Sequence, residues 1–124
     1  MTAMYDYILD CDLVVVASPV WFCCPSGVCL NILSRFQTFF NAGKRNDKLK
    51  IKKKKSVILL AAGGSGGVQE AQRAIKIALS SLNVSKEDIY CISSQKTDNL
   101  AAKSDEYAKA KIKETVQKIK DSGV

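Results

Sequence analysis

The chain has 124 residues, of which 47% are hydrophobic and 25% charged, a balance that excludes a disordered chain and fits one domain over residues 1–124. The net charge of +7 has one source, because Lys44 to Lys55 holds eight basic residues and one acid while the remainder holds 11 of each. The apolar runs are far shorter than the ~20 residues of a membrane span, and the acidic N-terminal segment lacks the features of a secretory signal, so we expect a cytoplasmic protein without a membrane partner.

The cysteines and the absence of histidine weigh against metal and triad chemistry. The five cysteines form no C-x-x-C pair, so neither a disulfide framework nor a zinc site is indicated. Without histidine, metal sites and catalytic triads are further disfavoured. We predict free, reduced thiols and no metal site.

The first half of the chain predicts a helix, a strand and a second helix. Ala3 to Leu9 has the pattern of a helix end, and Asp12 to Ser18 is a β-branched apolar run typical of a strand buried on both faces. A helix is predicted from Ser26 to Phe40, with Ser26 as its N-cap. Its apolar stripe comprises Cys29, Ile32, Leu33, Phe36, Phe39 and Phe40.

The second half continues this alternation. Ser56 to Ala62 repeats the buried-strand pattern, and a helix from Val68 to Leu82 is closed by Asn83 in a left-handed turn. Asp88 to Ser93 is a weaker strand, expected near a sheet edge. A last helix covers about Ser104 to Lys120, with an apolar stripe of Ala108, Ile112, Val116 and Ile119. Regular alternation of this kind predicts right-handed βαβ units over a parallel sheet, and therefore an α/β fold.

Two loops are the predicted functional segments, because ligands of open α/β sheets bind beyond the carboxyl ends of the strands. Pro19 to Ser26 places an aromatic pair beside backbone that two prolines stiffen, which suits a flat ring. Gly63 to Gly67 offers backbone without side chains just before a helix, where N–H groups can meet carbonyl oxygens or an anion. Each segment also has a plainer interpretation: the aromatic pair could cap the core, and the glycine segment could be only a turn.

Residues 11–30, CDLVVVASPVWFCCPSGVCL, resemble the third-strand signature of the NAD(P)H-dependent FMN reductase family of the flavodoxin-like superfamily. Residues 56–84, SVILLAAGGSGGVQEAQRAIKIALSSLNV, are similar to the fourth strand, glycine-rich loop and following helix of that family. The resemblance implies a flavodoxin-like three-layer α/β sandwich, with FMN as cofactor and NAD(P)H as co-substrate. The implied flavin-binding residues are Pro19, Val20, Trp21, Phe22, Ser26, Gly63, Gly64, Ser65 and Gly66. Because the flavin carries the hydride chemistry in such enzymes, no catalytic side chain is assigned.

The resemblance also has departures. Leu30 and Ser34 stand where the family usually has lysine and aspartate, whereas Arg35 is kept. The family's first strand and Gly-Ser-Pro-Arg-like phosphate loop would precede residue 1, so the resemblance implies an N-terminally truncated fold. Strand Asp12 to Ser18 would then be an exposed apolar edge, and we expect a homo-oligomer through it, although a swapped arrangement or a different partner chain would also cover it.

Three function classes therefore stay open, of which the least favoured is an anion-binding protein that uses the lysine tract Lys44 to Lys55. The first is an FMN-dependent NAD(P)H oxidoreductase that reduces flavin or a small acceptor by hydride transfer. The alternative is a non-catalytic flavodoxin-like module that no longer binds flavin and acts by oligomerisation. The basic tract Lys44 to Lys55 lacks interleaved aromatic residues and leads into the amino end of a strand, so a solvated loop is favoured over a nucleic-acid partner.

Overall fold

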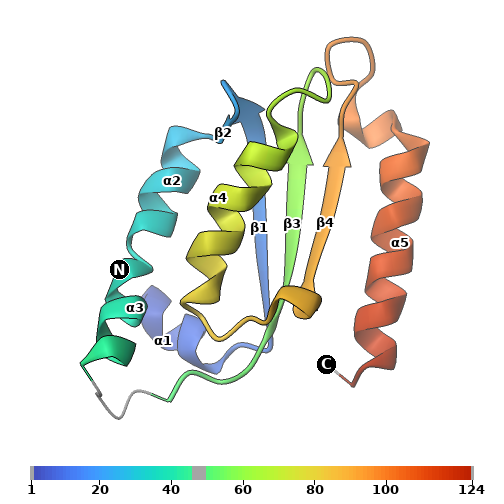
Figure 1. Ribbon diagram of the computed structural model, residues 1–124. Helices are drawn as coiled ribbons and strands as arrows, with labels where there is room; N and C mark the ends of the chain where they lie inside the picture. The colour runs from blue at the N-terminus through green and yellow to red at the C-terminus, as the bar shows by residue number, and fades with distance from the viewer. Residues whose placement is uncertain (1, 46–49, 124) are drawn as a thin grey trace.

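The computed structural model describes residues 2–45 and 50–123, and within them a four-stranded sheet lies between helices (Figure 1). The strands are β1 (Leu13–Trp21), β2 (Cys24–Pro25), β3 (Lys55–Ala61) and β4 (Ile89–Ser94). The order across the sheet is β2-β1-β3-β4, in which β1, β3 and β4 run parallel and β2 is antiparallel to the end of β1. The predicted parallel α/β sheet is confirmed, and so is the place of the weaker third strand at a sheet edge.

The helices connect these strands. They are α1 (Thr2–Asp10), α2 (Gly27–Ser34), α3 (Gln37–Lys44), α4 (Val68–Ser80) and α5 (Glu106–Asp121), with short 3₁₀ turns η1 (Lys86–Asp88) and η2 (Ala102–Ser104). Asn83 has a φ of 58°, so the predicted left-handed residue after α4 is confirmed. None of the helices within residues 2–45 and 50–123 is long and apolar enough to cross a membrane.

The core is divided by the sheet into a large and a small part. Side chains alternate between faces along β3, so Ile58 and Leu60 point to the side of α4 while Val57 points to the side of α5. The larger cluster joins the sheet to α1, α2, α3 and α4, and its largest fully buried apolar side chains are Ile58, Ile75, Leu79 and Leu82. The smaller cluster joins Val57 and Ile92 to Ile119 of α5. The result is three layers, and of the helices within residues 2–45 and 50–123 only α5 covers the second face.

The prediction of one continuous helix over Ser26 to Phe40 is wrong, because the chain turns between α2 and α3. The N–H of Arg35 donates to Ile32 O (3.1 Å) and that of Phe36 to Leu33 O (3.0 Å), which are the tight bonds of a 3₁₀ turn. Residues three apart lie on the same side of such a turn, so Leu33, Phe36 and Phe39 are all buried.

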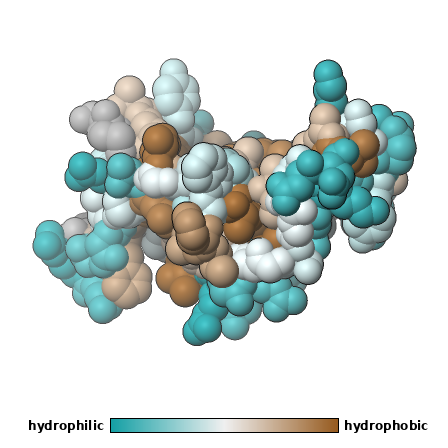
Figure 2. Space-filling view, turned by 90° about the horizontal axis from the view of Figure 1, so that it is seen from above, coloured by the Kyte–Doolittle hydropathy of each residue, from teal (hydrophilic) through white to brown (hydrophobic). Residues whose placement is uncertain are grey.

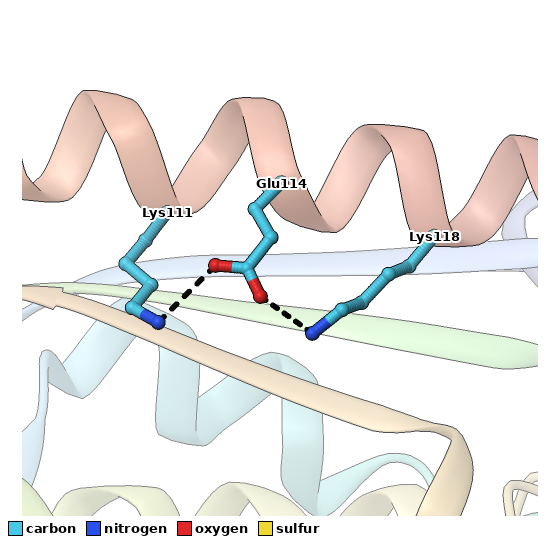
Figure 3. A network of polar contacts seen from close by, with 3 residues as sticks. All are labelled: Lys111, Glu114 and Lys118. Atoms are coloured by element: carbon cyan, nitrogen blue, oxygen red, sulfur yellow. Dashed lines mark hydrogen bonds and ion pairs between the residues drawn. The ribbon is translucent and has the colours of Figure 1, made fainter.

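The predicted apolar stripe of the last helix is only partly buried. Ala108 and Ile119 are buried, but Ile112 and Val116 are 40% and 45% exposed. These two side chains lie where α5 has no neighbouring helix among the described residues. In Figure 3, the side of α5 that faces the strands carries an exposed ionic network, in which Glu114 contacts Lys111 (3.2 Å) and Lys118 (2.6 Å).

Part of the basic tract pairs with acids at the amino ends of the strands. Lys52 contacts Asp12 at 2.6 Å and Lys53 contacts Asp88 at 3.2 Å. Lys54 is buried, its Nζ donates to Lys52 O at 2.6 Å, and burial lowers its pKa. Residues 46–49 of the predicted solvated loop lie outside the described residues.

Candidate functional site

A shallow pocket lies at the carboxyl ends of the three parallel strands. Its volume is about 340 Å³. The lining residues are Pro19, Val20, Trp21 and Phe22 at the end of β1, Ala61, Ala62 and Gly63 at the end of β3, and Thr97 and Asp98 after β4. Three loops that are far apart in the sequence therefore form one site, at the sheet edge where ligands of such folds bind.

Trp21 and Phe22 form the aromatic wall of the pocket, and a tight hairpin between β1 and β2 carries them. Trp21 pairs with Cys24, so only Phe22 and Cys23 form the turn. Both have positive φ values, 48° and 63°, as in a type I′ turn. The backbone twist of this turn matches the twist of the two antiparallel strands that it joins. Such backbone costs a non-glycine residue on the order of 1 kcal/mol. Trp21 and Phe22 are 66% and 99% exposed, so neither side chain caps the core.

The glycine segment contacts this hairpin. Gly67 has a φ of 79°, and a Cβ there would lie 2.6 Å from Cα of Cys23. Both the backbone angle and the close approach therefore require glycine. The contact fixes the hairpin against the N-terminus of α4.

Gly63 approaches a third loop, and a side chain at this position would require the exposed side chain of Asp98 to move. A Cβ at this position would collide with the carboxyl group of Asp98, so the two loops meet directly inside the pocket. By contrast, a Cβ at Gly64 or Gly66 would have no heavy atom within 4 Å, and Ser65 is exposed beside them. No contact among the described residues accounts for glycine at positions 64 and 66.

Ser26 lies outside this pocket. Its Oγ accepts the N–H of Cys29 (3.3 Å), which makes it the N-cap of α2 as predicted. Its own N–H donates to Ser18 Oγ (2.9 Å), and that hydroxyl donates to Pro19 O (2.8 Å). Ser26 therefore supports the backbone at the end of β1 but does not line the site. Of the other predicted residues, Pro19, Val20, Trp21, Phe22 and Gly63 line it, and Gly64, Ser65 and Gly66 follow in the same loop.

Thr97 and Asp98 were missed by the sequence interpretation. The N–H of Ala62 donates to Ser94 O (2.8 Å) and that of Thr97 to Ala62 O (3.1 Å), so backbone bonding continues past the strand ends and carries this loop over Gly63. The available signal was the polar run QKTDNL directly after the third strand, at the same sheet edge.

Asp105 anchors the far end of that loop. Its buried carboxylate accepts the Ala108 N–H (3.1 Å) as the N-cap of α5 and the Ser94 hydroxyl (2.8 Å) from the end of β4. These two hydrogen bonds hold the pKa of Asp105 below its ordinary value, the Ala108 bond most strongly. The loop that carries Asp98 is thus tied to both the sheet and α5.

A parallel sheet covered by helices on both faces, with a glycine loop and an aromatic hairpin beyond its carboxyl ends, is the arrangement of a flavodoxin-like α/β protein. The family of NADPH-dependent FMN reductases matches residues 1–97, which include every predicted site residue. The chain belongs to this family. No curated protein matches the sequence.

The residues present fit a flavin ring. The pocket combines the exposed rings of Trp21 and Phe22 with strand-end backbone, and Gly63 presents no side chain to it. A flat aromatic ring with polar edges can stack on the side chains of Trp21 and Phe22 and form hydrogen bonds with the strand-end backbone. Membership of the family implies use of FMN and NAD(P)H in general terms.

Proposed function

We propose that this chain is a flavin-dependent NAD(P)H oxidoreductase that holds FMN in the pocket between the aromatic hairpin and Gly63. The observation that carries the proposal is the convergence of two family segments, residues 19–22 and Gly63, on one pocket. The flavin, when bound, supplies the chemistry: it accepts hydride from the nicotinamide and passes the electrons to a second flavin or a small acceptor.

The protein's own part is to bind and orient the rings. Trp21 and Phe22 offer aromatic faces for stacking, and the hairpin that presents them is fixed by the contact between Cys23 and Gly67. Gly64, Ser65 and Gly66 are exposed just before the start of α4, a position where backbone N–H groups can donate to a ring carbonyl. No acid or base from the chain is needed for hydride transfer.

Flavin titration tests this function. Added FMN should lose fluorescence on binding, and Trp21→Ala should weaken binding about tenfold, because aromatic stacking contributes on the order of 1 kcal/mol or more. Tyr7→Ala is the matched control, since Tyr7 is 78% exposed on α1, a helix at the opposite end of the sheet (Figure 1). Protein that leaves FMN fluorescence unchanged at high concentration would refute the proposed function.

A second function, association through β1, is favoured by the open edge of that strand. Lys55 N donates to Asp12 O (3.0 Å) and Val14 lies opposite Ser56, so even-numbered residues direct their backbone groups to β3. The backbone N–H and C=O groups of the odd-numbered residues therefore point away from β3, and these residues are Leu13, Val15 and Ala17. Within residues 2–45 and 50–123, β2 pairs with β1 only at Val20 and Trp21, which leaves the rest of this edge open.

Both faces beside this edge are apolar. A groove of about 270 Å³ lies between residues 14–17 and α2, lined also by Val28 and Ile32, which are 72% and 43% exposed. On the other face, a groove of about 390 Å³ is lined by Ala17, Leu59 and Ile112. Seen from above, the surface is indented where α5 stands apart from the other elements (Figure 2). An apolar edge of this kind is a template for pairing with another chain.

The opposite edge strand of the sheet, β4, has lysine side chains beside it. Lys76 lies beside Cys91 on β4. Burial raises the pKa of the Cys91 thiol, and the positive charge of Lys76 lowers it by a smaller amount. Lys118 lies near Tyr90 on the same strand. Lysines beside an edge strand prevent further pairing. Among the described residues, none that lines the 270 Å³ groove at β1 is charged, so we propose that two copies associate there.

Light scattering tests the association. The wild-type chain should be dimeric or larger, and Val15→Lys should give monomers, because Val15 is 53% exposed on the open strand. Ile77→Lys is the control, with a 65% exposed isoleucine on α4. A wild-type monomer at high concentration refutes association. A dimer that binds no flavin supports the non-catalytic alternative.

A further inference from the structure

A second cavity, separate from the candidate flavin pocket, lies between α4 and β4. Its volume is about 600 Å³, almost twice that of the flavin pocket, and the two share no lining residue. One wall is the flank of α4 from Gln69 to Ser80, and the floor includes Val84 and Ile89. At the roughly 1.5 Å rise per residue of an α-helix, this wall is about 16 Å long. The cavity is therefore an elongated groove beside α4, which lies in front of the sheet in Figure 1, with β4 at the edge beyond β3.

The floor of this groove is apolar and is fixed by the core. Val84 is 6% exposed and belongs to the larger core cluster, and Ile89 packs against that cluster. Ile77, on the α4 wall, is 65% exposed, although isoleucine is among the residue types most often buried. A ligand that covers these three side chains removes apolar surface from water, which favours binding.

Three cations from two elements line the same groove. Arg73 and Lys76 lie on α4 and Lys86 lies on η1, while none of the nine lining residues is an acid. Within residues 2–45 and 50–123, the ion pairs all involve other lysines. Asp88, for example, contacts Lys53 and not Lys86, which is two residues before it. The groove therefore keeps positive charge that pairs with no described carboxylate.

The position of Lys76 brings this charge close to the apolar floor. Lys76 lies beside the Cys91 thiol of β4, so its ammonium group lies between the helix and the strand. Arg73 lies three residues before Lys76 and four before Ile77, a spacing that makes side chains neighbours on one side of a helix. Positive charge and apolar surface are thus within reach of one small molecule.

We propose that this groove binds a small organic carboxylate with an apolar body, either aromatic or aliphatic. The apolar body covers Ile77, Val84 and Ile89, and the carboxylate pairs with Arg73 and Lys76. The volume lies within the range of about 300–1,000 Å³ that small-molecule sites occupy. A nucleic acid is a poorer fit, because single strands bind cationic grooves through stacked aromatic side chains and none of the lining residues is aromatic. The proposal is independent of the proposed flavin site.

Fluorescence titration of the full chain with anilinonaphthalene sulfonate, an anionic apolar probe that brightens on leaving water, tests this groove. The neutral reference is phenylnaphthylamine, which has the same ring system without the sulfonate. Replacing both cations, Arg73→Gln with Lys76→Gln, should weaken binding of the anionic probe about fivefold, because each exposed ion pair contributes modestly. Binding of the neutral probe should change less than about twofold. Ile77→Ser should weaken binding of both probes, because it removes part of the apolar surface.

Lys103→Gln with Lys113→Gln is the matched control, because it removes two exposed charges outside the groove. Decanoate and naphthoate distinguish an aliphatic from an aromatic body, and at least one of them should displace the anionic probe from the wild type. Failure of both to displace it, an equal effect of the Arg73 and Lys76 substitutions on the two probes, or an equal loss in the control would overturn the proposal. FMN binding should be the same in all these variants, and loss of FMN together with the anionic probe would overturn the separation of the two sites.

Discussion

Gly67 and Cys23 lie so close together that a Cβ on Gly67 would lie 2.6 Å from Cα of Cys23. This contact joins the start of α4 to the tip of the β1–β2 hairpin. The hairpin turn is itself strained, with positive φ at Phe22 and Cys23. The position of the aromatic wall therefore depends on a glycine more than forty residues away in the sequence.

Gly67→Ala should lower the free energy of unfolding by about 2 kcal/mol or more, because alanine is strained at positive φ and would also displace Cys23. It should also weaken flavin binding by moving Trp21. Urea unfolding and flavin titration measure the two effects. Gly64→Ala, whose Cβ meets open space, should change stability by about 0.5 kcal/mol or less. Equal losses for both variants would contradict the role of the contact.

Phe39→Ala should cost about 3–5 kcal/mol of unfolding free energy. Phe39 is 3% exposed and its ring lies 5.3 Å from that of Tyr5 and 6.2 Å from that of Phe36, so truncation leaves a cavity between α1 and α3. The adjacent Phe40 is 44% exposed beneath Lys44, and Phe40→Ala should cost about 1 kcal/mol. Denaturant unfolding of the pair tests the turn between α2 and α3; the reverse order would favour a continuous helix.

Stability should fall at acid pH through Asp105. Its pKa is lower in the folded than in the unfolded chain, so its contribution is present above the unfolded pKa and is lost as the pH falls through the folded pKa. Asp105→Asn keeps an oxygen acceptor for Ala108 but does not titrate. The stability advantage of the wild type over this variant should therefore shrink from about pH 7 to about pH 3. Thermal unfolding across this range would show a constant difference if the carboxylate were not the cause.

Glu114→Gln should lower the melting temperature only slightly. Lys118 and Lys111 hold the pKa of Glu114 below its ordinary value, but the network is exposed on α5 and is screened by salt (Figure 3). We expect the small difference in melting temperature to vanish at about 1 M salt. A difference that persists there would indicate a packing role for Glu114.

The sequence predicted the parts of the structure that follow from local patterns. Asp12 to Ser18 and Ser56 to Ala62 lie within or beside observed strands because uninterrupted β-branched runs are distinctive. The turn at Arg35 and Phe36 was not predictable from the stripe alone, because residues at three-and-four spacing fit a straight helix equally well. The hydrogen bonds of Arg35 and Phe36 show the turn, and the packing of Phe39 against Tyr5 accompanies it.

The candidate site was predicted in part for a similar reason. Pro19 to Phe22 and Gly63 were found because they follow strands and resemble a family signature. Asp98 was not, because its role comes from a backbone bond between Thr97 and Ala62 that no local pattern encodes. The exposure of Ile112 and Val116 likewise depends on which elements pack against α5, and the apolar periodicity of a helix does not predict its neighbours.

The open edge of β1 ends at Pro19, and Pro19 also lines the flavin pocket. A second chain bound along β1 and a flavin bound beyond it would therefore meet at one residue. Where occupancy of one site changes the affinity of the other, the factor is the same in both directions. With the proposed dimer and the proposed flavin site coupled in this way, a flavin affinity measured at one protein dilution would describe only that dilution.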